Sequence, residues 1–165
     1  MIWYMISVIV IALDQITKLV IKSNLEYGEK IPVIRNFLYI TYHTNTGAAW
    51  GMLSNATVFL TVFSGLMALA LVFIIPRFHN KCLKWATCLI LGGAVGNQID
   101  RLVQGKVTDF IATFYWGYGF PVFNIADSAI VIGSVLLLVY MFFFYNDEDF
   151  AFMNTGKGKK GKEGL

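Results

Sequence analysis

The sequence predicts an all-α polytopic membrane protein with four transmembrane helices and a small extracytoplasmic β platform. Of the 165 residues, 57% are hydrophobic and only 14% are charged, and the mean hydropathy is +0.63. A soluble domain carries about 25% charged residues, so this chain has too little charge to cover a water-facing surface. A soluble domain and a disordered chain are therefore disfavoured, and a net charge of +3 is too small to predict nucleic-acid binding.

Four apolar stretches approach the length of about 20 residues that crosses a bilayer core. The predicted spans cover residues 1–21, 58–75, 83–99 and 123–145, and residues 1–145 are predicted to form a single membrane-embedded domain. The first stretch lacks a basic flank and a small-residue cleavage site, so we interpret it as a retained span rather than a signal peptide. The third is rich in small residues, which lets neighbouring helix backbones approach closely.

Basic residues indicate the orientation of the spans. The connection between the second and third spans contains Arg77, Lys81 and Lys84 without an acid, and residues 146–165 end in a Gly/Lys-rich run. Both regions are predicted to face the cytoplasm, which places both termini inside. We interpret residues 146–165 as a disordered tail that is attracted to anionic headgroups.

The two outer connections contain β-type sequence. Phe37–His43 (FLYITYH) and Lys106–Ile111 (KVTDFI) are rich in β-branched and aromatic residues, and each is predicted to form a short strand. Lipid cannot satisfy open sheet edges. A sheet built from these strands is therefore expected at the outer headgroups, where the aromatic residues of 114–120 suit the interface.

Four of the ten acids lie in or beside the predicted spans: Asp14, Asp100, Asp109 and Asp127. Ionisable groups at membrane depth are costly and indicate a functional site by default. The predicted topology places all four in the outer half of the membrane or at its surface. Helical spacing groups their neighbours into three polar patches, which are expected to face one another. The patches are Asp14 with Lys18; Gly93, Asn97, Asp100 and Arg101; and Asn124, Asp127 and Ser128.

Carboxylate chemistry is the chemistry that these residues could perform. The chain has no His-Glu-x-x-His zinc motif, and Cys82 and Cys88 match neither a metal pattern nor a disulfide framework. Two carboxyls held close together share one proton, so one can activate water while the other polarises a carbonyl. This is the chemistry of aspartic proteases, but spacing and topology leave open which two of the four acids form the pair, and on their own they do not establish a protease.

Purely structural roles are possible for each group. Asp14 and Lys18 could form an intrahelical ion pair, and Asp100 with Arg101 a helix-end pair. Asn97 and Asn124 could join helices by hydrogen bonds, Asp127 could be a helix-start acid favoured by the dipole, and Asp109 could be an ordinary surface aspartate.

Five segments in order resemble the lipoprotein signal peptidase (signal peptidase II) family of bacterial intramembrane aspartic proteases. They are LDQITK (13–18), NTGAAWG (45–51), GGAVGNQIDR (92–101), VTDFI (107–111) and FPVFNIADS (120–128). The resemblance implies that Asp109 and Asp127 are the catalytic dyad. Asp100 matches the motif too, but we expect a structural role for it. The resemblance also implies that seven further residues support the site or contact substrate: Asp14, Lys18, Asn45, Gly47, Asn97, Arg101 and Asn124.

The resemblance implies an activity as well. Members cleave prolipoproteins immediately before a cysteine that carries a diacylglyceryl group, and the antibiotic globomycin blocks them. We therefore expect a bacterial plasma-membrane endopeptidase with its active site near the outer face, surrounded by membrane lipid. No metal or organic cofactor is expected, and a monomer suffices. A proton-coupled transporter and a non-catalytic scaffold are the alternatives. The transporter would need polar groups on both sides of the membrane, and the scaffold would tolerate loss of Asp109 and Asp127.

Overall fold

The computed structural model describes residues 2–47 and 57–153. Its four long helices are α1 (Tyr4–Asn24), α2 (Thr57–Ile74), α3 (Lys81–Gln104) and α4 (Ile125–Phe143). Its strands are β1 (Lys30–Ile34), β2 (Leu38–Asn45), β3 (Val107–Tyr115) and β4 (Tyr118–Gly119). Two 3₁₀ helices follow α2 and α4: η2 (Ile75–Arg77) and η3 (Asp147–Met153).

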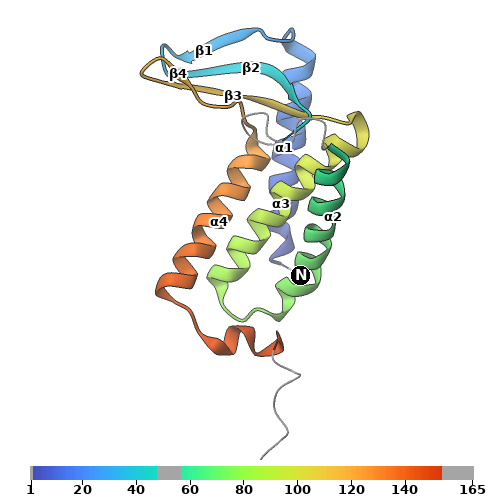
Figure 1. Cartoon of the computed structure of the whole chain (residues 1–165), viewed down its shortest axis with the longest axis vertical. Coiled ribbons are helices and arrows are strands. Elements are labelled where there is room, and N and C mark those ends of the chain that lie inside the picture. Colours follow the sequence, from blue (N-terminus) through green and yellow to red (C-terminus); the bar gives the residue numbers. More distant parts are fainter. Residues whose placement is uncertain (1, 48–56, 154–165) are drawn as a thin grey trace, which may run out of the picture.

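The long helices lie side by side, the sheet crosses one of their ends, and η3 lies at the opposite end with the start of α1 (Figure 1). Each predicted span corresponds to one long helix. Within the described residues, three helical segments are long and apolar enough to cross a membrane: Tyr4–Asn24, Thr57–Arg77 and Ile125–Phe143.

Helix α3 is more polar because it is the central helix, packed against α1, α2 and α4. Its neighbours bury Asn97 and Asp100, so these polar groups do not face lipid. Asn80 caps its start by accepting a hydrogen bond from the backbone N–H of Cys82, and Gly105 ends it with a φ of 72°. The count of four membrane spans remains a prediction, since α3 is not among the three apolar segments.

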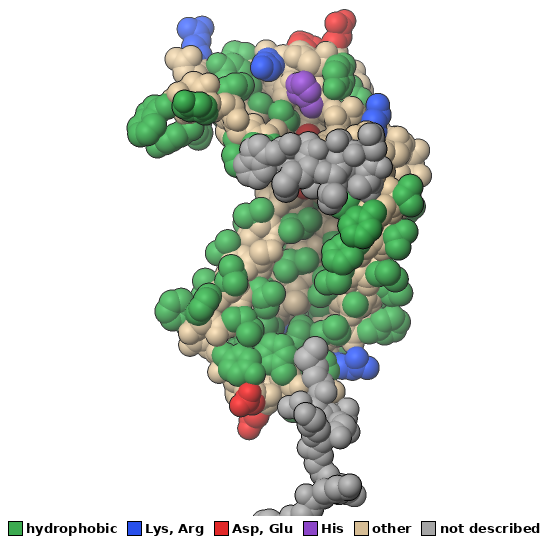
Figure 2. Space-filling view, in the orientation of Figure 1, with side chains coloured by type: hydrophobic (Ala, Val, Ile, Leu, Met, Phe, Trp, Pro, Cys, Tyr) green, Lys and Arg blue, Asp and Glu red, His purple; other side chains and the backbone are tan. Residues whose placement is uncertain are grey.

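The helices expose apolar side chains outward, whereas charged side chains gather at the two ends of the molecule (Figure 2). Val58, Val62 and Leu66 of α2 are all more than half exposed. Water would penalise such a surface, whereas lipid tails accept it. The distribution of side chains therefore suits a bilayer around the helices.

Glycines on α3 set the spacing of the bundle. A Cβ atom at Gly92 would lie 2.8 Å from the Cβ of Val10 on α1, and one at Gly93 would collide with the backbone oxygen of Ala126 on α4. A Cβ at Gly96 would lie 2.8 Å from Asp14 Oδ2. The small residues of the third span thus permit the close helix packing that the sequence predicts.

The sheet is antiparallel, in the order β1-β2-β3-β4. The two predicted strands are confirmed as β2 and β3, which are both longer than expected. The sequence analysis did not predict β1 or β4. Strand β1 is an edge strand that contains Pro32, a residue that weakens a strand prediction, and β4 has only two residues.

The segment predicted as a disordered tail from residue 146 contains η3, so the structure differs from this prediction over residues 147–153. Asp149 is buried there and accepts hydrogen bonds from the Tyr140 hydroxyl (2.6 Å) and the Asn80 backbone N–H (3.1 Å). These two partners and the packing of Phe150 against Phe78 hold η3 on the bundle. The Gly/Lys-rich remainder, residues 154–165, lies outside the described residues.

Candidate active site

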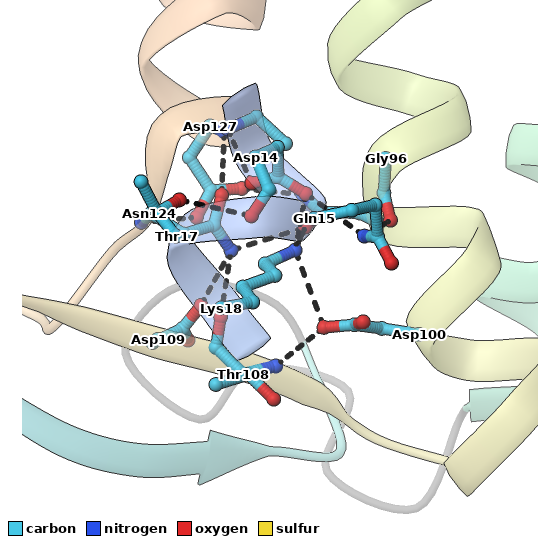
Figure 3. Close-up of polar contacts among 12 residues, drawn as sticks. Asp14, Gln15, Thr17, Lys18, Gly96, Asp100, Thr108, Asp109, Asn124 and Asp127 are labelled. Atoms are coloured by element: carbon cyan, nitrogen blue, oxygen red, sulfur yellow. Dashed lines mark hydrogen bonds and ion pairs between the residues drawn. The ribbon is translucent and has the colours of Figure 1, made fainter. Parts of the chain in front are cut away.

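Polar side chains from four elements meet where the helices reach the sheet. Helix α1 contributes Asp14 and Lys18, α3 contributes Asp100, β3 contributes Asp109, and the start of α4 contributes Asn124 and Asp127 (Figure 3). Helix α3 also contributes Asn97. All are buried except Asp127, which is part-buried. The structure therefore brings the three predicted polar patches together and adds β3 to them.

Lys18 is at the centre of the helical part of this cluster. Its Nζ atom lies 2.8 Å from Asp14 Oδ2 and 3.2 Å from Asp100 Oδ2, and it donates a hydrogen bond of 3.0 Å to Asn97 Oδ1. These three acceptors match the three protons of an ammonium group. Lys18 is only 1% exposed, and a buried charge is tolerable when it is paired and hydrogen-bonded in this way.

The predicted ion pair between Asp14 and Lys18 is present, but Asp14 also binds another helix. Its Oδ1 atom accepts a 3.0 Å hydrogen bond from the backbone N–H of Ala126 in the first turn of α4. A helix start has unpaired N–H groups and a positive dipole end, and a carboxylate satisfies both. Asp14 thus fixes the start of α4 beside Asp127.

Asp100 does not form the helix-end pair with Arg101 that we considered. Its carboxylate binds Lys18, and Oδ2 also accepts a 2.9 Å hydrogen bond from the backbone N–H of Thr108 on β3. Arg101 is half-buried and, across residues 2–47 and 57–153, forms no side-chain hydrogen bond or ion pair. The sequence led us to expect a structural role for Asp100, and these contacts are structural in character.

Two asparagines connect the cluster to the proposed dyad. Asn97 Nδ2 donates a 2.7 Å hydrogen bond to Asp127 Oδ1, while its Oδ1 accepts from Asn124 Nδ2 at 3.0 Å. Asn124 Nδ2 also donates to Asp109 Oδ1 at 2.7 Å and to the backbone oxygen of Thr108 at 3.2 Å. The amide of Asn124 therefore links α3, β3 and the start of α4.

The sequence around Asn124 explains the placement of Asp127. Asn124 is the N-cap of α4, and its Oδ1 accepts the backbone N–H of Asp127 at 2.9 Å. Asp127 Oδ2 in turn accepts the backbone N–H of Asn124 at 3.2 Å, which completes a capping box. Asp109 and Asp127 thus both accept hydrogen bonds from Asn124, one from its side chain and one from its backbone.

Asp109 lies on β3, opposite His43 of β2. Burial, and then the nearby charge of Asp127, raise the pKa of Asp109 to about 7. The hydrogen bonds from Asn124 and Asn45 and the positive charge of Lys18 act in the opposite direction, but they are outweighed. A carboxyl group in this position can hold a proton near neutral pH.

The NTGAAWG segment is described only through Gly47. Asn45 is the last residue of β2, and its Oδ1 accepts a 2.8 Å hydrogen bond from the backbone N–H of Gly47. Its side chain also binds Asp109. Asn45 therefore holds the start of this segment beside Asp109, while residues 48–51 lie outside the described residues.

Sequence reasoning did not single out Gln15, Thr108 or Ala126 as site residues. Gln15 Nε2 donates to Asp14 Oδ2 and to the backbone oxygen of Gly96, both at 3.1 Å. Thr108 and Ala126 act through backbone groups, which every residue possesses, so no residue-type signal could have identified them. Gln15 follows Asp14 directly in a hydrophobic span, and a polar residue in that position was a usable signal.

One surface pocket reaches the cluster. It has a volume of about 410 Å³ and adjoins Asp109. Among the described residues its walls are His43, Thr44, Asn45, Gly119, Phe120, Pro121 and Val122. Across this part of the chain, no three His, Cys, Asp or Glu side chains gather as metal ligands would.

Comparisons with known proteins agree on one relationship. The family model described as signal peptidase (SPase) II matches residues 6–143. Two solved structures described as bacterial membrane enzymes, determined by the in meso method at 2.3 and 1.9 Å resolution, are similar to this chain. The first is 36% identical with a TM-score of 0.79, and the match covers 98% of this chain and 94% of the other. The second is 39% identical with a TM-score of 0.78, and it covers 87% and 94%, respectively.

Proposed function

This chain belongs to the signal peptidase II family of aspartic peptidases, and from that premise we propose its reaction in detail. Family membership supports cleavage of lipoprotein signal peptides in a bacterial membrane. We propose that the chain hydrolyses the bond immediately before the diacylglyceryl-modified cysteine of a prolipoprotein. Asp109 and Asp127 are the proposed catalytic dyad.

The hydrogen bonds around Asn124 are the observation that supports Asp109 and Asp127 as the dyad. The Asn124 amide donates to Asp109 at 2.7 Å, and the Asn124 backbone N–H donates to Asp127 at 3.2 Å. The other two acids of the cluster are already occupied, because Asp14 and Asp100 bind Lys18 and backbone N–H groups. Asp109 also adjoins the pocket, where a peptide can approach.

In the proposed reaction the two carboxyls share one proton. The ionised carboxylate removes a proton from water, whose oxygen attacks the carbonyl carbon before the lipidated cysteine, while the protonated carboxyl donates to the carbonyl oxygen. The tetrahedral intermediate then collapses, the C–N bond breaks, and the cysteine nitrogen receives a proton. The raised pKa of Asp109 suits it to hold the shared proton at rest.

The remaining site residues are proposed to support this pair. Asn97 and Asn124 orient the carboxyl oxygens, and Asn45 binds Asp109 from β2. Asp14 and Lys18 hold α1, α3 and α4 together. Gly47 remains a proposed substrate contact. Arg101, which interacts electrostatically with Asp100, Asp109 and Asp127, is proposed to contact substrate.

The position of the cluster suits a lipid-anchored substrate. It lies where apolar helices meet a sheet (Figure 1), so acyl chains can stay among lipids while the peptide bond reaches the carboxyls. We propose that this end faces outward and that both termini face the cytoplasm. We also propose that one copy suffices and that residues 1–145 form one domain.

The test is cleavage of a purified diacylglyceryl prolipoprotein in detergent, with the released signal peptide quantified by mass spectrometry. We expect wild-type cleavage that globomycin stops. Asp109→Asn and Asp127→Asn are each expected to lower kcat by at least about 10³-fold, because each removes a group that moves a proton in the reaction.

The matched control is Asp147→Asn, which changes an exposed carboxylate of η3 and is expected to cleave at the wild-type rate. Circular dichroism and gel filtration verify that all three variants fold. Normal processing by a folded Asp109→Asn or Asp127→Asn protein would refute the dyad and assign the catalysis to other residues of the chain.

A further inference from the structure

The pocket beside Asp109 has residues that the proposed reaction does not use. His43 and Thr44 come from β2, Gly119 ends β4, and Phe120, Pro121 and Val122 belong to the connection between β4 and α4. We propose that this pocket binds the first two or three residues of the mature lipoprotein that follow the lipidated cysteine. The inference rests on the proposed function and adds a specificity site to it.

The position of the two acids gives the direction of the substrate. Asp127 is in the first turn of α4, a helix apolar enough to span a membrane, whereas Asp109 is on the sheet. Of the two, Asp109 adjoins the pocket. A signal peptide must stay among the helices because it is apolar, so the chain beyond the cut bond leaves on the sheet side. On the sheet side, this part of the substrate chain passes Asp109 and enters the pocket.

His43 lies close to the place beside Asp109 where the substrate chain would leave the active site. It pairs with Asp109 across the two strands, and directly paired residues of an antiparallel sheet have Cβ atoms about 4.5–5.5 Å apart on one face. The ring of Tyr27 packs edge-on against the imidazole with 5.3 Å between ring centroids. His43 therefore offers a positioned hydrogen-bonding group to the peptide backbone just beyond the cut.

Phe120 provides an apolar wall. Its ring packs edge-on against Phe123 at 5.9 Å between centroids, and the side chain is still 54% exposed. Its backbone N–H donates to the oxygen of Thr113 at 2.8 Å, so β3 fixes its position. A rigid aromatic ring beside polar groups can bind one apolar side chain of the substrate together with the backbone that carries it. An extended chain advances about 3.3 Å per residue, so the second residue after the cysteine can reach this wall.

The experiment compares two lipidated substrates with one signal peptide. One ends as an amide directly after the modified cysteine, and the other continues for three residues with leucine as the second residue after the cysteine. For the wild type we expect kcat/KM to be about tenfold higher for the longer substrate, the gain that one apolar side chain brings in a pocket. The ratio of kcat/KM for the longer substrate to kcat/KM for the shorter one is expected to fall to about two in Phe120→Ala. In His43→Gln this ratio is expected to fall about threefold.

Phe37→Ala is the matched control, because Phe37 is an exposed aromatic residue in the turn between β1 and β2, outside the pocket. It is expected to keep the wild-type ratio. A second pair of substrates differs in the residue before the cysteine, and Phe120→Ala is expected to leave the ratio of kcat/KM within that pair unchanged.

The outcomes separate the two proposals. If the wild type cleaves neither substrate, the proposed function fails. If it cleaves both with equal kcat/KM, the pocket proposal fails and the proposed function survives. A loss of ratio in Phe37→Ala equal to that in Phe120→Ala, or an effect of Phe120→Ala confined to the residue before the cysteine, would also overturn the pocket proposal.

Discussion

Lys18 connects the two kinds of polar group in the cluster. It pairs with two carboxylates that hold the fold together, and it binds Asn97, which in turn binds the proposed catalytic Asp127. A single buried cation therefore maintains both the helix contacts and the orientation of a carboxyl that the reaction needs.

Replacement of the cation is expected to be costly. In Lys18→Met, Asp14 and Asp100 lose the ammonium group between them, and breaking a buried pair typically costs about 3–5 kcal/mol. Thermal unfolding in detergent measures this loss. Lys22→Met is the control, because Lys22 binds only the neutral Gln104 among described partners, and its loss is expected to cost about 1 kcal/mol. Equal melting temperatures for the two variants would contradict this role of Lys18.

The pKa of Asp109 predicts an alkaline limit of activity. Burial and the charge of Asp127 raise this pKa to about 7, and the reaction needs one proton on the pair. We expect kcat/KM to fall above about pH 7, by about tenfold per pH unit once the proton is lost. Initial rates between pH 5 and 9 measure the profile, and a constant rate up to pH 9 would contradict the shared proton.

The stability of the folded protein is also expected to depend on the protonation of Asp109. The pKa of Asp109 is raised in the folded state above its usual value near 3.9. Its stabilising contribution is therefore complete below about pH 4 and is lost as the pH rises through about 7. Asp109→Asn removes this dependence, so its melting temperature relative to wild type is expected to be higher at pH 8 than at pH 5.

At the scale of elements, α3 determines how the site is assembled. Gly92 and Gly96 face α1, and Gly93 faces α4. These contacts hold the three helices close enough for short side chains to bind across them. Asn97 of α3 binds the side chain of Asp127 on α4, and Asp14 of α1 binds the backbone N–H of Ala126 on α4. The glycines thus position the polar residues without contacting the reacting bond.

Gly93→Ala tests this positioning. The added methyl group would collide with the backbone oxygen of Ala126, the residue before Asp127. We expect a loss of about 1–3 kcal/mol in stability from overpacking, together with a lower kcat in the folded fraction. Gly65→Ala is the control, since its nearest neighbour is the flexible Gln98 side chain at 3.2 Å. A fully active and stable Gly93→Ala protein would contradict the close contact.

At the scale of the whole molecule, features that depend on local composition could be predicted from sequence. Apolar length located the long helices, and β-branched and aromatic residues located β2 and β3. The partners of Lys18 and Asn124 could not be predicted, because they come from separate elements that meet only after folding. Spacing left the choice of dyad open, and only the family resemblance favoured Asp109 and Asp127, which remain a prediction.

The missed elements have physical explanations as well. Strand β1 depends on pairing with β2 despite Pro32, so its stability is not encoded in its own residues. The 3₁₀ helix η3 looks like a solvated acidic run in the sequence. Its order comes from Tyr140 and Asn80, which bind Asp149 from distant parts of the chain.

The dispersal of the cluster along the chain also has a consequence for synthesis. A ribosome delivers Asp14 and Lys18 first and Asp127 last, and Asp127 gains its orientation only when α4 begins at Asn124. A nascent chain that has inserted three helices therefore lacks one of the two proposed acids and the bridging amide. With Asp109 and Asp127 as the proposed dyad, we expect hydrolytic activity only after the final helix is in place, so translation itself would delay the protease until its fold is complete.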